Sequence, residues 1–359
     1  MVAKKRKPTK SKTYDRLKCV CPICCIVPPY MLREIAVNGT AEQRNWAFQT
    51  LIVSEQFRGR REAIGGIQLM TPAGEKRRTI YDAKNGIELP GTLVRVENDP
   101  PTGDLAVDEA YDGSGATYDF FNDIYDRNSI DDRGMRLDST VHYGVNYDNA
   151  FWNGSQMVYG DGDGEVFNRF TKAVDVIAHE LTHGVTENEA ALIYYGESGA
   201  LNESFSDVFG VLVKQRLLNQ TADQADWIIG EGLLTEKING VGIRSMKAPG
   251  TAYNDPLLGR DPQPANVKDQ YRGRDDNGGV HINSGIANRA FYLAAIEIGG
   301  YAWEKAGRIW YIALRDRLRS RANFRRAANT IIAIAGELYG PESLEQRAVR
   351  NAWQQVGVL

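Results

Sequence analysis

Two histidines four residues apart, with a glutamate directly after the first, are the feature that most restricts how this chain can fold. His179, Glu180 and His183 follow the mostly apolar run 173–178, which is typical of a buried helix. Positions i and i+4 of a helix lie on one face, so both imidazoles can bind one Zn²⁺ while Glu180 reaches a metal-bound water. With only four histidines in the chain, a chance match is improbable. The sequence therefore predicts a zinc helix here.

Two acidic residues follow the zinc motif at a spacing that suits a third metal ligand. Catalytic zinc keeps three protein ligands and one open position. Glu203 lies twenty residues after His183, which leaves room for a second helix to pack beside the first. Asp207 lies one turn later on the same face, where we expect it to accept the other N–H of a ligand imidazole. We expect Asn202, in the same run, to support the ligands likewise.

His281 is a further candidate for chemistry, because it follows a glycine-rich bend and precedes a helical pattern. Asp276 is placed to orient its ring and to hold it cationic, which suits stabilisation of an oxyanion. Taken alone, a single histidine more often has a packing role, so both interpretations stay open at this point.

The charge distribution is uneven along the 359 residues. Six cations between Lys4 and Lys12 precede the first acid, Asp15, and the remaining chain is mildly acidic. We interpret the basic tail as solvated and expect no nucleic-acid partner and no membrane role. No stretch approaches the ~20 apolar residues of a membrane span. The apolar run 19–32 is broken by prolines, so we expect secretion by a non-classical route or retention in the cytoplasm.

The hydrophobic pattern divides the chain into three parts. Residues 1–70 contain the basic tail, a cysteine cluster and a small helical unit with helical spacing over 41–57. Residues 71–190 have the pattern of short strands and turns, with one helix expected over 117–125, and end in the zinc helix. Residues 191–359 are helical in pattern, and we expect helices at 201–218, 284–298, 301–318, 323–338 and 342–355. The predicted fold class is α+β, a β-rich lobe followed by an all-helical lobe.

These features together resemble the thermolysin family of zinc metallopeptidases. The resemblance runs from about Thr79 to the C-terminus and rests on motifs in the family's order, at 149–155, 158–164, 179–187, 199–207, 244–246 and 276–290. It implies two lobes with zinc in the cleft between them, an endopeptidase activity, and peptide and protein substrates. Because the family is usually monomeric, we expect a monomer.

The resemblance also implies roles in the reaction. Zinc would be bound by the two motif histidines and Glu203. Glu180 would be the general base that activates the zinc-bound water and then passes the proton to the leaving amine. His281 and Tyr194 would stabilise the tetrahedral intermediate, with Asp276 orienting His281.

Substrate binding follows from the same resemblance. Asn149 and Ala150 would bind the substrate backbone as an added strand, and Arg244 would hold a substrate carbonyl. An apolar pocket would favour cleavage before a large hydrophobic residue. Its lining would comprise Phe167, Phe170, Val176 and Ile243.

The N-terminal segment resembles one branch of the family, the protealysin-like enzymes with a short propeptide. This resemblance rests on residues 28–32, Arg44, Thr50 and Leu51. It implies that the propeptide covers the cleft as an intramolecular inhibitor. Self-cleavage within residues 58–78 would then release the enzyme.

One departure from the family concerns calcium. Asp175, Asp226 and Glu231 match acidic ligands of a double calcium site, but Lys214 and Ile228 replace two other acids. A lysine cannot ligate Ca²⁺, which needs six to eight oxygens, and its ammonium would instead neutralise the same carboxylates. The sequence therefore weakens the case for calcium as a second cofactor beside zinc.

The cysteine cluster is the other departure. All four cysteines lie close together near the N-terminus, at Cys19, Cys21, Cys24 and Cys25. Three interpretations stay open: latency thiols that reach the open zinc position, a separate metal or redox site, or exposed thiols without a role.

Three functions are compatible with the zinc motif. The leading hypothesis is an endopeptidase made as a self-cleaving zymogen. A catalytically silent peptide-binding protein would not need Glu180, Tyr194 and His281. A zinc hydrolase of another substrate would not need the peptide-binding residues at 149, 150 and 244.

Overall fold

A computed structural model of the chain describes residues 24–60 and 75–359. The predicted basic tail, Cys19 and Cys21 lie outside the described residues. So does most of the predicted cleavage segment, 58–78.

Within the described residues, six strands form one sheet in the order β1-β5-β6-β4-β2-β3. Their bounds are β1 Cys24–Cys25, β2 Arg78–Asp82, β3 Thr92–Val96, β4 Leu137–Val141, β5 Ala150–Trp152 and β6 Met157–Tyr159. β2, β4 and β6 are parallel to one another, and the other pairings are antiparallel. The N-terminal segment thus supplies an edge strand, in which Cys25 lies opposite Phe151.

Helix α3 (Leu105–Tyr125) packs on one side of this sheet, and it is far longer than the helix predicted over 117–125. The part of α3 that was not predicted contains Gly113 and Gly115, which are sites of close packing. A Cβ at Gly113 would lie 2.4 Å from Cδ1 of Ile177, and one at Gly115 would lie 2.3 Å from a guanidinium nitrogen of Arg78. Tertiary packing therefore outweighs the low helix propensity of these two glycines.

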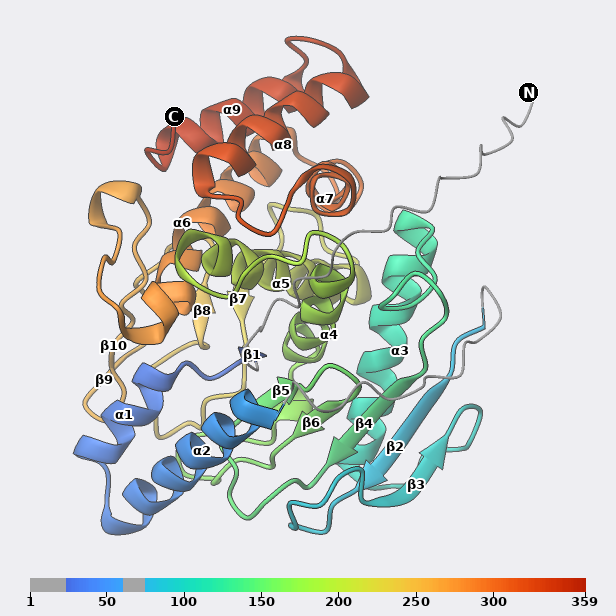
Figure 1. Cartoon of the computed structure of the whole chain (residues 1–359), viewed down its shortest axis with the longest axis vertical. Helices are drawn as coiled ribbons and strands as arrows, with labels where there is room; N and C mark the ends of the chain where they lie inside the picture. Colours follow the sequence, from blue (N-terminus) through green and yellow to red (C-terminus); the bar gives the residue numbers. More distant parts are fainter. Residues whose placement is uncertain (1–23, 61–74) are drawn as a thin grey trace.

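Two adjacent helices connect the lobes. α4 (Val174–Asn188) and α5 (Gly196–Leu217) pack side by side in the middle of the molecule (Figure 1). In that view the C-terminal helices α7, α8 and α9 lie above them, and α6 lies beside α5. Their bounds are α6 Asp275–Ile298, α7 Ala306–Ile312, a π-helical turn Ala313–Arg317, α8 Phe324–Tyr339 and α9 Leu344–Gln355.

The predicted fold class is confirmed, with one difference in the C-terminal lobe. Short antiparallel pairs lie between α5 and α6, so that this lobe is not purely helical. These pairs are β7 Ile228–Ile229 with β8 Arg244–Ser245, and β9 Asn254–Asp255 with β10 Gly259–Arg260. A 3₁₀ turn at Phe170–Lys172 precedes α4, and another at Val267–Asp269 precedes α6. No helix in the described ranges is long and apolar enough to cross a membrane.

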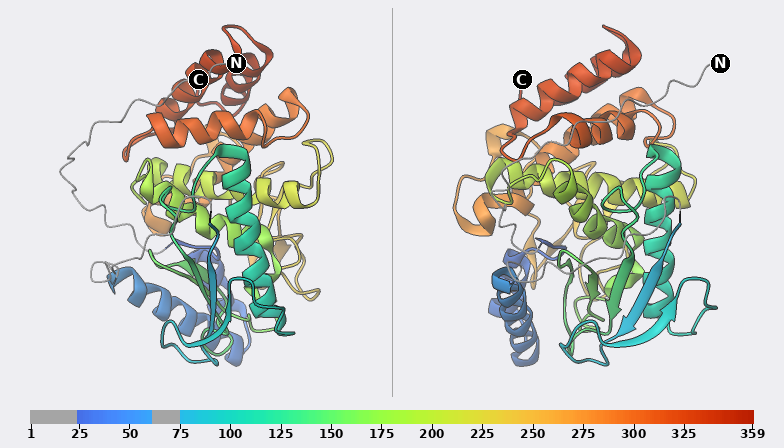
Figure 2. Two further views of the ribbon diagram at one scale, coloured as in Figure 1. Left: turned by 90° about the vertical axis from the view of Figure 1, so that its right-hand side faces the viewer. Right: turned by 45° about the vertical axis from the view of Figure 1, so that its right-hand side comes forward.

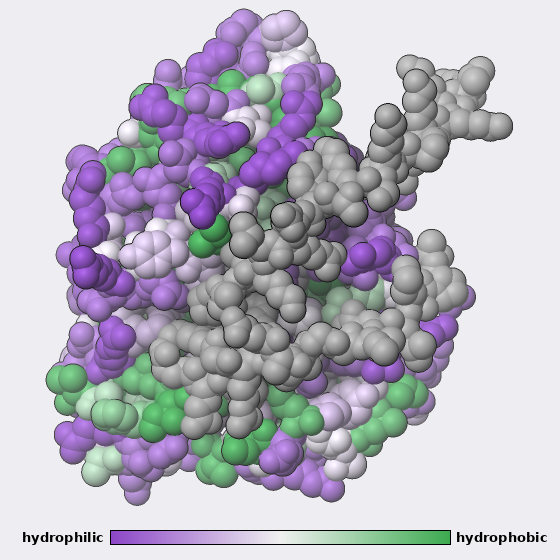
Figure 3. Space-filling view, viewed as in Figure 1, coloured by the Kyte–Doolittle hydropathy of each residue, from purple (hydrophilic) through white to green (hydrophobic). Residues whose placement is uncertain are grey.

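The N-terminal segment continues from β1 into a helical hairpin of α1 (Pro29–Asn38) and α2 (Ala41–Arg60). The hairpin and α3 lie on opposite sides of the sheet (Figure 2). Met31, Leu32 and Ile35 of α1 are buried. The outer face of the hairpin exposes Val37 and Phe48, and apolar surface extends over this part of the molecule (Figure 3).

Candidate metal centre and active site

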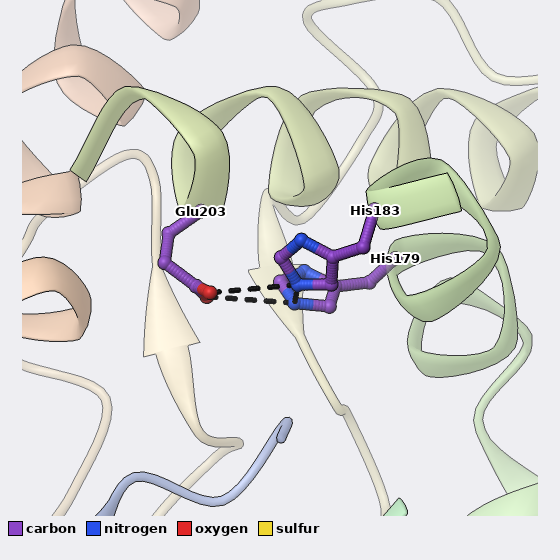
Figure 4. Close-up of side chains that lie close together, drawn as sticks. All are labelled: His179, His183 and Glu203. Carbon is purple, nitrogen blue, oxygen red and sulfur yellow. Dashed lines mark hydrogen bonds and ion pairs between the residues drawn. The ribbon is translucent and has the colours of Figure 1, made fainter. Parts of the chain in front are cut away.

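The predicted metal ligands meet at one buried point. His179 and His183 extend from α4, and Glu203 from α5 opposite them (Figure 4). Each offers a ligand atom within 4.8 Å of the other two. The carboxylate oxygens of Glu203 lie 3.5 Å from Nε2 of His179 and 3.4 Å from Nε2 of His183. These residues form a site that can hold a metal ion.

The hydrogen bonds at the two Nδ1 atoms show why a cation fits between the two Nε2 atoms. Nδ1 of His179 lies 2.8 Å from the Asp207 carboxylate, and Nδ1 of His183 lies 2.8 Å from the side-chain oxygen of Asn202. Both partners are acceptors, so each Nδ1 carries the proton and each Nε2 presents a lone pair. The two Nε2 atoms are 3.0 Å apart, and Oε2 of Glu203 has no hydrogen-bond partner among the described residues. Three converging electron-pair donors of this kind suit Zn²⁺.

Asp207 is the centre of a buried charge network. Besides His179, its carboxylate accepts two hydrogen bonds from Arg244, at 2.8 and 2.7 Å, and one from Asn288 at 2.8 Å. Burial alone would raise the pKa of Asp207, but the Arg244 guanidinium and His179 hold it well below its ordinary value. The predicted contact to a ligand imidazole is present. Asn288 was not predicted, although it lies seven residues after His281 and hence two turns along the same helix face.

Glu180 lies beside the metal ligands and is fully buried. One oxygen accepts the N–H of Trp152, on β5, at 3.1 Å. The other oxygen has no hydrogen-bond partner among the described residues. Burial first, and then the Glu203 carboxylate, raise the pKa of Glu180 well above its ordinary value. A carboxylate in such surroundings has a high affinity for a proton, as a general base requires.

His281 faces the metal ligands from the opposite wall. The chain turns through left-handed residues at Asp276–Gly279, and Asp276 then accepts from both Nδ1 and the backbone N–H of His281, at 2.6 and 2.8 Å. Burial opposes the charged form, yet Asp276 and Glu203 raise the pKa of His281. The Tyr194 hydroxyl lies 3.0 Å from Nε2 of His281 and donates to Glu203. The structure thus brings together the three residues predicted to act on the intermediate.

The chain's own N-terminal segment lies in this site. The N–H of Ile26 donates to the carbonyl of Ala150 at 3.2 Å, and Arg244 donates to the carbonyl of Ile26 at 3.1 Å. The Asn149 side chain binds both backbone groups of Val27, at 3.0 and 3.4 Å. These are the groups that the sequence predicted to bind a substrate backbone. That residues 25–27 occupy them was not predicted residue by residue, because nothing in their local sequence shows where an extended segment docks.

The apolar residues predicted to line a pocket are all buried. Phe167, Phe170, Val176 and Ile243 belong to the same apolar cluster as Ile26. The rings of Phe167 and Phe170 are tilted, with centroids 5.6 Å apart. These four residues and Ile26 are thus parts of the main hydrophobic core of the described chain.

The cysteines are only partly described, because the structure gives the backbone of Cys24 and the whole of Cys25. The side chain of Cys25 belongs to an aromatic cluster with Tyr143, Tyr147 and Phe151. Its backbone carbonyl, rather than its sulfur, faces His281 at 3.2 Å. For Cys25 this arrangement does not support the prediction of a latency thiol on the metal.

The acidic residues compared with calcium ligands surround a lysine. Nζ of Lys214 lies 2.7 Å from Asp226 and 2.8 Å from Glu231. Asp175, which is buried, accepts the N–H of Gly230 at 2.8 Å, and burial raises its pKa although Lys214 lowers it. The ammonium therefore supplies positive charge among these carboxylates.

Replacing Lys214 with methionine should lower the free energy of unfolding by about 1.5–3 kcal/mol, because two charge-assisted hydrogen bonds are lost. Urea unfolding measures the change. Lys237→Met is the matched control: its exposed pair with Glu165 should contribute at most about 1 kcal/mol. A calcium chelator should leave the unfolding midpoint of the wild type unchanged; a large decrease would show instead that calcium stabilises this region.

Comparison with known proteins agrees with this geometry. Family models described as the thermolysin metallopeptidase catalytic domain and its alpha-helical domain match residues 68–187 and 190–358. An extracellular metalloprotease of Pectobacterium carotovorum subsp. carotovorum is 55% identical over 94% of this chain and 97% of that protein. Protease PrtS of Photorhabdus sp. (strain Az29) is 49% identical over 93% of this chain and 91% of that protein.

Among solved structures, the precursor of protealysin from Serratia proteamaculans is similar to this chain. It superposes with a TM-score of 0.87 at 55% identity, covering 94% of this chain and all of that one. The sequence, the fold and the buried ligand set lead to one conclusion: this chain belongs to the thermolysin family of metallopeptidases, in its protealysin-like branch.

Proposed function

We propose that this metallopeptidase is made as a zymogen, that it cleaves peptides and proteins before a bulky hydrophobic residue, and that its own N-terminal segment inhibits it. The observation that supports the proposal most is the seating of residues 25–27 among the predicted substrate-binding groups. We further propose residues 1–70 as the propeptide and 71–190 and 191–359 as the two catalytic lobes. The enzyme would act as a monomer outside the cell.

When bound by His179, His183 and Glu203, zinc would supply a Lewis acid and lower the pKa of a bound water. Glu180 would take a proton from the attacking water and give it to the leaving amine. His281, kept cationic by Asp276, and the Tyr194 hydroxyl would donate hydrogen bonds to the oxygen on which charge develops. Asn149, Ala150 and Arg244 would fix the register of the substrate strand.

Specificity follows from the apolar cluster around Ile26. Two peptides that differ only in the residue after the scissile bond, isoleucine or glycine, should differ about 10- to 100-fold in kcat/KM, because burying a branched apolar side chain contributes about 1.5–3 kcal/mol. The assay uses enzyme freed of its N-terminal segment, with and without a zinc chelator. Equal rates for the two peptides would rule out the proposed pocket, and activity that survives the chelator would rule out a zinc enzyme.

A further inference from the structure

The backbone of residues 25–27 crosses the active site in one defined register. Cys25 pairs with Phe151 as an edge strand, and the next two residues continue along β5. Each carbonyl from Cys25 to Val27 and each N–H of Ile26 and Val27 meets a group of the site. Because strand side chains alternate, a slip of one residue would exchange the environments of Cys25 and Ile26.

Groups of the active site contact both ends of the Cys25–Ile26 peptide bond. The oxygen of the Cys25–Ile26 bond lies 3.2 Å from Nε2 of His281, which itself lies 3.7 Å from the Glu203 carboxylate of the metal site. The nitrogen of the same bond donates to the Ala150 carbonyl at 3.2 Å, and Glu180 is held beside the same strand by the N–H of Trp152 at 3.1 Å. The next carbonyl, that of Ile26, accepts from Arg244 instead. A group that stabilises charge therefore lies at the oxygen of the Cys25–Ile26 bond, and the proton carrier Glu180 lies at the strand that holds the nitrogen of this bond.

The side chains and the flanking structure keep this register fixed. Ile26 is completely buried in the main hydrophobic core, whereas Cys25 is buried in a separate aromatic cluster. Helix α1 starts three residues after Ile26, and its buried face is packed against the protein. The Cys25–Ile26 bond is therefore held in one position relative to the groups of the site. Such positioning is the condition for an efficient reaction.

We propose that the Cys25–Ile26 bond is itself a substrate of this active site, a self-cleavage site separate from the segment 58–78. The inference rests on the proposed function. Hydrolysis consumes one water: its oxygen joins the carbonyl carbon of Cys25, the C–N bond breaks, and Glu180 transfers one water proton to the nitrogen of Ile26. The second water proton leaves the new carboxyl group and also ends on this nitrogen, so that the products are a carboxylate and an ammonium group. No group is oxidised or reduced. The fragment 1–25, with eight Lys or Arg, one acid and all four cysteines, leaves the protein.

The test is a time course of intact mass on the full-length chain with zinc at neutral pH, with the new N-termini identified. We expect a product that begins at Ile26, formed at a rate independent of protein concentration, and no such product from Glu180→Gln. Ile26→Asp should slow this cleavage at least tenfold, because a charge cannot enter the apolar cluster. Val37→Asp, at an exposed position of α1, should leave it unchanged.

A binding measurement provides a readout without turnover. In the zinc-loaded Glu180→Gln background, a labelled peptide with the sequence of residues 22–29 should bind at least tenfold more tightly when Ile26→Asp has displaced the chain's own segment. Fluorescence anisotropy measures this affinity. An unchanged affinity would show that the segment does not occupy the site in solution and would overturn the inference.

The two proposals fail in different ways. If the sample hydrolyses an added peptide while the Cys25–Ile26 bond stays intact, the inferred cleavage site is wrong and the peptidase remains. If neither the added peptide nor the chain is cut, even after the segment 58–78 has been severed by another protease, both proposals are wrong.

Discussion

Replacing Glu180 with glutamine is expected to lower kcat/KM by about 10²–10⁴-fold, the usual contribution of a positioned general base. The amide keeps the shape of the side chain but cannot take a proton from water. Because Glu180 is not among the three residues whose ligand atoms converge, zinc content should not change. Steady-state kinetics on enzyme freed of its N-terminal segment, with zinc determined by elemental analysis, measures both quantities.

Glu165→Gln provides the control for this experiment. Glu165 is half exposed, pairs with Lys237 and lies outside the proposed site, so the variant should retain the wild-type rate. A Glu180→Gln enzyme with its zinc and nearly full activity would eliminate Glu180 as the base. A Glu180→Gln enzyme without zinc would show instead that this carboxylate holds the metal.

Replacing Asp207 with asparagine is the change expected to reduce stability most, by about 3–5 kcal/mol, because it leaves a buried cation without its counter-charge. The Arg244 side chain is fully buried and forms both of its ion-pair hydrogen bonds with this carboxylate. The asparagine also loses one acceptor oxygen, either the one that faces His179 or the one that faces Asn288. Zinc affinity should fall about 10- to 100-fold for the same reason, as it does when other partners of metal-bound histidines are removed.

Urea unfolding and a zinc competition titration measure the two effects of Asp207→Asn. Asp119→Asn is the matched control, because it removes a half-exposed carboxylate whose pair with Lys76 should contribute at most about 1 kcal/mol. If the two variants have the same stability, the buried network does not stabilise the fold in the way described. Normal zinc affinity in Asp207→Asn would show that His179 needs no partner at its Nδ1.

The metal site was the most predictable part of this protein, and helix geometry explains why. His179 and His183 lie one turn apart on a helix, so their common face follows from their spacing alone. Glu203 required only a second helix packed beside the first, which the structure provides as α5. The pairing of Asp207 with Arg244 joins residues 37 positions apart, and the sequence suggested only the separate roles of the two.

Long-range contacts account for the predictions that were incomplete. The predicted helix over 117–125 lacked the start of α3, which contains Gly113 and Gly115; these glycines have a low helix propensity, but in the fold they allow Ile177 and Arg78 to approach. The propeptide was expected to cover the cleft, but the residues of it that occupy the site were not assigned, because Val27 and Asn149 are 122 residues apart. Local patterns specify which segments form helices and strands, but they do not specify which distant segment completes a sheet edge.

Because residues 25–27 are covalently attached to the enzyme that they occupy, inhibition by this segment does not depend on how much protein is present. A short tether corresponds to an effective concentration in the millimolar range. Diluting the zymogen, for instance on release from a crowded compartment into a large volume, would therefore not activate it. Once the chain is cut between α2 and β2, the same contacts obey ordinary mass action, and dilution alone then drives the inhibitor away.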